Sequence, residues 1–219
     1  MKTISSIVEN YIKTKPFLLN ALSQGIINLT SLARVMMVDL EQELGKDVKQ
    51  GAIVMALKRL SEDLDFRLNH KIVKVLKNIG EITVRSSLID YTFSVSETIL
   101  DKQALLISDI KSYPDIFYTS SRGVNETNIV VSESVSHYIE KYFASEKLLQ
   151  KQDNLASITV KLPKENIIVP GIYYFIFQRL AWEGIIINEV ISTSNEFTIL
   201  VSEDQVDVAF KVIKDLKSL

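Results

Sequence analysis

The sequence predicts an α+β protein, with a helical head over residues 1–80 and a body built from two similar units. Two observations lead to this prediction. In the head, apolar residues recur every three to four positions, which is typical of amphipathic helices. In the body, residues 125–133 (NETNIVVSE) reappear as residues 195–203 (NEFTILVSE), with six of the nine positions identical. An internal repeat indicates the unit from which a chain is built, so we expect two copies of one fold.

The head is expected to contain three helices. The first, over residues 4–22, should bend or restart at Pro16, because proline lacks the amide hydrogen that a helix interior uses. Asn28 or Thr30 can cap the second helix, and Gly45 can end it. Asp47 can cap the third helix, with Gln50 reaching back to the cap. The apolar face of the third helix would consist of Ile53, Ala56, Leu57, Leu60 and Leu64.

Two helices joined by a short turn that contains glycine indicate a helix-turn-helix. Residues 81–95 are rich in β-formers, and a strand pair after the helices would make the head a winged helix. The head carries 12 Lys and Arg against 8 Asp and Glu, and the rest of the chain carries 13 against 19. A mildly basic head permits contact with nucleic acid. Candidate DNA-binding residues are Lys49, Gln50, Lys58 and Arg59 on the third helix and Arg85 as a wing cation.

A second interpretation of the head stays open. Any packed three-helix unit turns its corners in a similar way, and Glu62, Asp63 and Asp65 place acidic charge at the end of the third helix. The head would then be a dimerisation or docking module instead of a DNA-binding domain.

In the second copy, we expect a strand over residues 156–162, a loop, and a helix with Pro170 at its first position. Strands over 185–193 and 196–201 should follow, and then a capping box at 202–205 that opens a helix over 206–216. The first copy repeats this order with segments 88–95, 97–110, 116–120, 128–131 and 135–143. The order β-α-β-β-α is the ferredoxin-like arrangement.

Residues 169–180 (VPGIYYFIFQRL) and 183–194 (EGIIINEVISTS) closely resemble an ACT domain, in particular the tandem ACT modules that regulate aspartate kinases. The resemblance covers residues 169–216, is weaker in the first copy, and does not extend to the head. It implies regulation by a bound amino acid, with lysine, threonine and branched-chain amino acids as candidates. Transferred position by position, it implies a ligand shell of Glu165, Asn166, Val169, Gly171, Ile172 and Asn188. ACT-like modules commonly associate, so a homodimer or higher oligomer is expected.

The second copy leaves no room for the last strand of its sheet. Three sources are open: a strand such as Glu81–Arg85, an exchange of strands between the two units, or a second subunit. The sequence therefore predicts domains over residues 1–80, 81–152 and 153–219, with the origin of one strand undecided.

Residues for enzymatic chemistry are sparse. The chain has no cysteine and two histidines, and its seven glycines are scattered. We therefore expect no catalytic residues, no metal site, no cofactor and no enzyme activity. The start of the chain lacks the apolar core of a secretory signal, and no apolar run is long enough to span a bilayer, so a cytoplasmic protein is expected.

These expectations combine into one functional hypothesis. The chain would sense an amino acid or a similar small ligand and act as a transcriptional regulator with a DNA-binding head. The alternative is a non-catalytic regulatory subunit, or interaction module, that modulates a separate enzyme of amino-acid metabolism such as an aspartate kinase.

Overall fold

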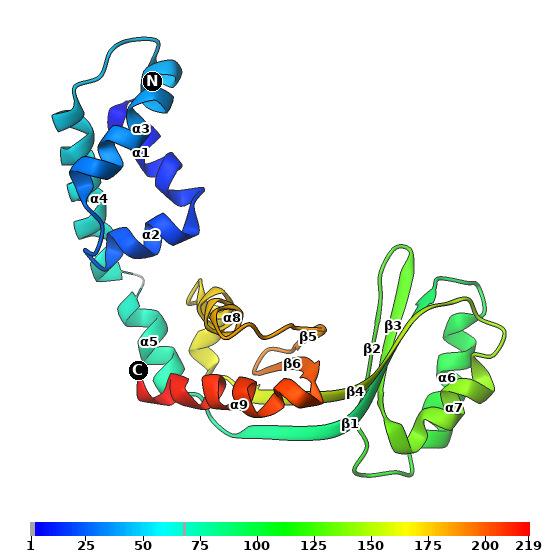
Figure 1. Cartoon of the computed structure of the whole chain (residues 1–219). Coiled ribbons are helices and arrows are strands. Elements are labelled where there is room, and N and C mark those ends of the chain that lie inside the picture. Colours follow the sequence, from blue (N-terminus) through cyan, green and yellow to red (C-terminus); the bar gives the residue numbers. More distant parts are fainter. Residues whose placement is uncertain (1–2, 68) are drawn as a thin grey trace. The chain divides into compact units, whose positions relative to one another are not determined.

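The computed structural model describes residues 3–67 and 69–219 and divides the chain into two compact units, Met1–Ile72 and Val73–Leu219 (Figure 1). The side chains of residues 16, 20 and 63–70 also lie outside the description. The predicted roles of Asp63, Leu64 and Asp65 at the end of the third head helix therefore fall outside the described residues.

Helices are the regular secondary structure of the first unit within its described residues. Its helices are α1 (Ile4–Lys13), α2 (Pro16–Ser23), α3 (Leu29–Leu44) and α4 (Gln50–Arg67), and α5 (Asn69–Lys77) crosses into the second unit. The predicted break before Pro16 is confirmed. Buried apolar side chains from α1 to α4 form one core, which includes Ile7, Val8, Ile12, Leu22, Leu32, Met36, Leu40, Ile53 and Leu57.

Local sequence explains the ends of α3. The Asn28 side chain accepts a hydrogen bond of 2.9 Å from the Ser31 amide, so the predicted cap is confirmed. Gly45 has a φ of 67° and its amide donates to the Glu41 carbonyl, which is the left-handed helix ending that glycine favours.

The start of α4 differs from the prediction. Gln50 is the first residue of the helix, and its side-chain amide donates to the Thr30 carbonyl at 3.1 Å instead of reaching back to Asp47. The Val48 amide donates to the Glu41 carboxylate at 3.1 Å. The turn between the two helices is thus held by acceptors from α3, and the capping box expected at Asp47 and Gln50 does not form.

The second unit contains one antiparallel sheet, with strands in the order β2-β3-β1-β4-β6-β5. The strands are β1 (Ile82–Ser94), β2 (Tyr118–Arg122), β3 (Glu126–Ser132), β4 (Leu148–Lys161), β5 (Glu189–Ser192) and β6 (Glu196–Ser202). Its other helices are α6 (Ile99–Ile110), α7 (Ser136–Tyr142), α8 (Ile172–Trp182) and α9 (Val206–Asp215).

The long strands β1 and β4 each serve both halves of this sheet. The first half contains β2, β3, residues 88–94 of β1 and residues 148–152 of β4. The second half contains β5, β6, residues 155–161 of β4 and residues 82–85 of β1. The strand that the second copy lacks is therefore supplied by the segment after Glu81, as one of the three alternatives proposed. The exchange is reciprocal, because β4 completes the first half.

Strand β1 is consequently not a wing of the head. It pairs with β3 and β4 inside the sheet of the second unit, so Arg85 lies in that sheet. The guanidinium of Arg85 donates to the Asp115 carbonyl at 2.8 Å.

Helices cover one face of each half. In the first half, Ile89, Tyr91 and Phe93 pack against residues of α6 and α7 such as Ile99, Leu106 and Ile139. In the second half, Phe197 contacts the rings of Tyr173 and Phe177 on α8. The uncovered faces of the two halves meet: Asn128 on β3 and Glu189 on β5 lie 3.3 Å apart, although three strands separate β3 from β5 in the sheet. The sheet is therefore strongly curled.

Gln205 accounts for two departures from the prediction in the second half. Its side chain accepts from the Ile186 amide at 3.1 Å and donates to the Gly184 carbonyl at 3.3 Å. Residues 184–186 are held in this way outside the strand, and β5 begins at Glu189 instead of at residue 185. The predicted capping box at 202–205 does not form either, because Gln205 is engaged and the Ser202 hydroxyl donates to Asp204.

None of the helices within the described residues combines the length and the apolar character that crossing a bilayer requires.

Candidate functional site

The predicted ligand segment lies between β4 and α8. A short 3₁₀ turn (Lys164–Ile167) follows the strand, and α8 starts at Ile172. Gly171 stands at the N-cap with a φ of 91°, so Pro170 precedes the cap and does not occupy the first helical position. Side chains are strained at this φ, which explains the glycine. No side chain caps α8, and the backbone amides of its first turn have no side-chain acceptor.

A surface hollow of about 450 Å³ opens beside this helix start. Four of the six predicted ligand residues line it, namely Asn166, Val169, Gly171 and Ile172. The remaining lining residues are Ile167, Ile168, Pro170, Tyr173 and Tyr174. The hollow thus combines apolar walls with the positive end of a helix, which attracts carboxylates.

Asn166 fixes the shape of the loop. Its side-chain amide donates to the carbonyls of Pro163 and Ser194, each at 2.9 Å. The second bond ties the loop to the turn between β5 and β6. Asn166 therefore has a structural role that its place in the predicted ligand shell did not suggest.

Glu165 and Asn188 do not line the hollow. Glu165 is exposed, and its carbonyl accepts from the amides of Ile168 and Val169. The Asn188 side chain instead donates to Gln152 at 3.0 Å, at the junction of the two halves. The structure brings Asn166, Val169, Gly171 and Ile172 together around the hollow, and it leaves Glu165 and Asn188 outside its lining.

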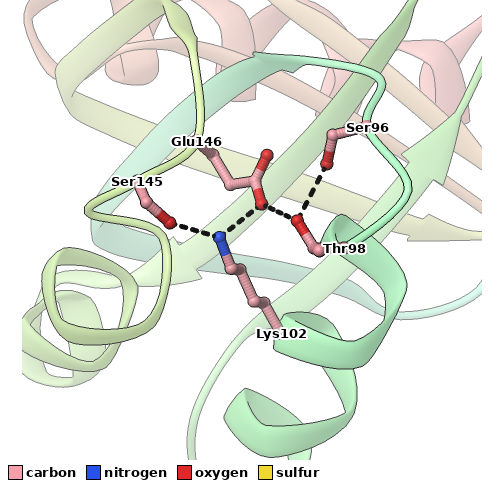
Figure 2. A network of polar contacts seen from close by, with 5 residues as sticks. All are labelled: Ser96, Thr98, Lys102, Ser145 and Glu146. Carbon is pink, nitrogen blue, oxygen red and sulfur yellow. Dashed lines mark hydrogen bonds and ion pairs between the residues drawn. The ribbon is translucent and has the colours of Figure 1, made fainter.

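The equivalent place in the first half is filled by the protein itself (Figure 2). The Glu146 carboxylate lies beside the start of α6, where it accepts from the Thr98 hydroxyl at 2.7 Å and pairs with the Lys102 ammonium at 2.5 Å. Lys102 also donates to the Ser145 hydroxyl at 2.6 Å. The Glu146 side chain is 4% exposed, and the hydrogen bond from Lys102 is the main reason that the pKa of Glu146 is lowered to about 2.

A second polar group at the junction of the halves was not predicted. Asp90 is buried and accepts from the Asn128 side chain at 2.5 Å, and the same amide lies 3.3 Å from Glu189. Burial, reinforced by the Glu189 carboxylate and opposed by Asn128, raises the pKa of Asp90 from 3.8 to about 6. Burial also raises the pKa of Glu189. Single polar residues within strands carry no sequence signal of such a cluster, since the partners come from β1, β3 and β5.

The four DNA-binding residues predicted on the third helix of the head fall into two groups. Lys49, Lys58 and Arg59 are exposed on the first unit, whereas Gln50 is partly buried and bonded to α3. Met55 is 54% exposed on α4, so the surface of this helix is not purely cationic.

Among the described residues, no group of three or more His, Cys, Asp or Glu side chains is arranged to hold a metal ion.

Comparison with solved structures finds proteins whose fold is similar to that of this chain. The chain is similar to aspartate kinase from Clostridium acetobutylicum, with a TM-score of 0.52 and 14% identity over 63% of this chain and 34% of that one. It is similar to the ligand-free regulatory subunit of aspartate kinase from Thermus thermophilus, with a TM-score of 0.50 and 9% identity over 63% of this chain and 97% of that one. These likenesses show the fold, an α+β arrangement whose curled antiparallel sheet resembles ACT-type regulatory domains.

A structure of aspartokinase alpha and beta subunits gives a TM-score of 0.52 and 13% identity over 68% of this chain and 99% of that one. The chain thus spans two of these structures almost completely and only about a third of the Clostridium kinase. No protein-family model matches the sequence, and no curated protein matches it. The expected ACT-like architecture is supported by structure, while the helix-turn-helix head finds no support in these comparisons.

Proposed function

We propose that this chain is a non-catalytic regulatory protein whose second unit binds an amino acid and whose helical head acts on a separate protein. The observation that carries the proposal is the difference between the two halves. In the first half, Glu146 places a carboxylate beside the start of α6. In the second half, the start of α8 opens into a hollow of about 450 Å³. Of the two equivalent helix starts, the start of α8 is therefore the one with room for an external carboxylate.

The hollow suits a zwitterion. The amides at the start of α8 can donate to a carboxylate. Glu165 does not line the hollow, but its exposed side chain on the adjoining turn can approach the ammonium group of a bound ligand. The walls supplied by Val169, Ile172 and Tyr173 would contact an apolar side chain.

A second copy of the chain is expected to complete this site. Ile167 and Ile168 are 67% and 79% exposed at its rim, and adjacent apolar residues of this exposure are typical of surfaces that another molecule covers. We therefore expect a homodimer, and we keep the cytoplasmic location expected from the sequence as part of this proposal.

The partner would be an enzyme of amino-acid metabolism such as an aspartate kinase. The similar structure from Thermus is itself a regulatory subunit, and the matched part of this chain is comparable in extent with the second unit. The head, which lies outside the ACT-type fold, would provide the contact with that enzyme.

The test is a thermal-shift screen of the full-length chain with each of the twenty amino acids, because binding to the folded state raises the unfolding temperature. We expect a concentration-dependent rise with one or a few of them. Glu165→Ala should reduce the rise, whereas Glu183→Ala, which removes an exposed acid at the opposite end of α8, should keep it. Absence of any shift at millimolar concentration would overturn the proposal.

DNA binding is a second candidate for the output, favoured by the exposure of Lys49, Lys58 and Arg59. It is tested by fluorescence anisotropy with duplex DNA over a range of salt concentrations, because neutralising phosphates makes affinity fall as salt rises. The DNA hypothesis requires the double variant Lys49→Ala, Arg59→Ala to bind more weakly than the charge-matched variant Lys147→Ala, Lys211→Ala. Enzyme regulation without DNA binding predicts no such difference.

A further inference from the structure

A separate cavity of about 300 Å³ lies in the first half, between the helix-covered face of the sheet and the end of α7. We call it the Tyr91 cavity. It is lined by Tyr91, Phe93, Ile139, Glu140, Phe143, Ala144, Glu146, Leu148 and Lys151. None of these residues belongs to the hollow beside α8, so the two sites are distinct.

The cavity lies at an open edge of the sheet. Residues 148–152 of β4 pair with β1, and the pairing of β4 with β6 begins only at Leu155. Among the described strands, nothing pairs with the other side of residues 148–152. A small molecule can therefore reach the cavity from this edge without disturbing the sheet.

Tyr91 supplies an unused hydrogen-bonding group. The residue is 3% exposed and lines the cavity, yet its hydroxyl has no hydrogen-bond partner within the described residues. Leaving a buried polar group unpaired costs about 1–3 kcal/mol. Burial also raises the pKa of Tyr91, so the phenol keeps its proton and acts as a donor. A ligand acceptor would satisfy this hydroxyl.

Lys151 adds a positive charge to the lining of the Tyr91 cavity. Its ammonium lies 5.5 Å from the centre of the Tyr91 ring and 3.4 Å from the exposed Asp153 carboxylate. A solvent-exposed ion pair contributes little to stability, so Lys151 can exchange this partner for a ligand at low cost. The Glu146 carboxylate is already engaged by Lys102, and the exposed Glu140 carboxylate also lines the cavity. Lys151 and Tyr91 are therefore the lining side chains that can donate a hydrogen bond to a carboxylate.

We propose that the Tyr91 cavity binds a small organic carboxylate with an apolar body. The carboxylate accepts a hydrogen bond from the Tyr91 hydroxyl and pairs with the Lys151 ammonium. The apolar body lies against Phe93, Phe143 and Leu148. This site is independent of the proposed function, because no residue of the α8 hollow takes part.

The experiment is calorimetric titration of the full-length chain with 3-phenylpropionate and with phenethylamine, which shares its apolar body and has the opposite charge. We expect the carboxylate to bind and the amine not to bind. Tyr91→Phe and Lys151→Met should each weaken binding of the carboxylate about tenfold or more, as expected for a lost hydrogen bond to a charged group.

Two controls separate loss of the ligand contacts from loss of charge and from loss of folding. Lys147→Met removes the same charge from an exposed lysine outside the cavity and should leave binding unchanged. Without ligand, Tyr91→Phe should be at least as stable as the natural protein, because the hydroxyl that it removes has no partner. Failure of 3-phenylpropionate to bind, equal binding of the amine, or binding that survives both cavity variants would each overturn the proposal. Glu165→Ala, which is directed at the proposed α8 site, should leave the binding of 3-phenylpropionate to the Tyr91 cavity unchanged.

Discussion

Ser87 and Asn154 hold corresponding positions in the two strands that both halves share, and both have a left-handed backbone, with φ values of 56° and 57°. The pairing of β1 with β4 steps from Arg85–Ser157 to Leu88–Leu155 and then to Asp90–Gln152. In this stretch β1 and then β4 each contain one extra residue, and a further shift follows between Thr92 and Phe93. Two bulges of this kind bend a sheet and increase its twist, which allows the open faces of the two halves to meet.

The residues two places before these positions connect the halves. Arg85 donates to the Asp115 carbonyl across the junction at 2.8 Å. Gln152 accepts from the Asn188 side chain at 3.0 Å, again across the junction. The internal repeat is thus visible in the contacts of the junction as well as in the fold.

The left-handed backbone at Ser87 predicts an unusual response to glycine. A left-handed conformation costs an L-residue about 1–2 kcal/mol, and β-branched residues suffer most. In urea unfolding, we expect Ser87→Gly to keep or raise the free energy of unfolding, and Ser87→Val to lower it by about 1–2 kcal/mol. Thr83→Gly, in the regular part of β1, should lower it by about 0.5–1 kcal/mol. Equal losses in Ser87→Gly and Thr83→Gly would contradict this explanation.

The periodic and repeated parts of the sequence predicted the fold well. Helix ends with local signals, such as Asn28 and Gly45, were correct because the atoms that determine them are close in sequence. The errors arose where a distant residue decides the local structure. Gln205 holds residues 184–186 through contacts about twenty positions away, and no local pattern reveals this.

In the candidate site too, contacts between residues close in sequence were predicted and contacts between distant residues were not. Asn166, Val169, Gly171 and Ile172 are neighbours in the chain and line one hollow. Asn188 was transferred from a family resemblance, and its side chain instead bonds Gln152 on the shared strand β4. The sequence could not show this contact, because it depends on the curled sheet.

The buried Asp90 predicts that stability falls as pH rises. Its pKa is raised in the folded state, so the folded protein binds the proton more tightly than the unfolded chain does. The resulting stabilisation is fully present below about pH 3.8 and is lost as pH rises through about 6. Asp90→Asn should remove this dependence and raise the free energy of unfolding at pH 7 by on the order of 2 kcal/mol.

The measurement is urea unfolding of both proteins at several values between pH 4 and pH 8. Glu126→Gln, an exposed change of the same kind on β3, should keep the pH dependence of the natural protein. If Asp90→Asn and the natural protein show parallel pH profiles, Asp90 does not titrate as inferred.

Glu146 predicts the opposite dependence on pH. Its pKa is lowered by Lys102, so its contribution to stability is present above about 4.5 and is lost as pH falls through about 2. Glu146→Gln should therefore lower the free energy of unfolding at pH 7. It should also make that free energy depend less on pH at acidic pH. A double-mutant cycle with Lys102→Met should give a coupling energy of about 1–3 kcal/mol. The pair Lys141–Asp109, at 3.8 Å and with side chains 61% and 35% exposed, is the more solvent-accessible control and should couple by less than about 1 kcal/mol.

Two glycines of the head should respond in opposite directions to alanine. Gly45 ends α3 with a φ of 67°, and Gly51 lies in the first turn of α4 without the positive φ of Gly45; an added Cβ would meet no atom within 4 Å at either position. Both positions therefore have room for a methyl group, and they differ only in backbone conformation. We expect Gly45→Ala to lower the free energy of unfolding by about 1 kcal/mol, and Gly51→Ala to raise it by about 0.5 kcal/mol through helix propensity and reduced freedom of the unfolded chain. Urea unfolding followed by far-ultraviolet circular dichroism measures both, and a loss of stability in Gly51→Ala would show that α4 does not begin as described.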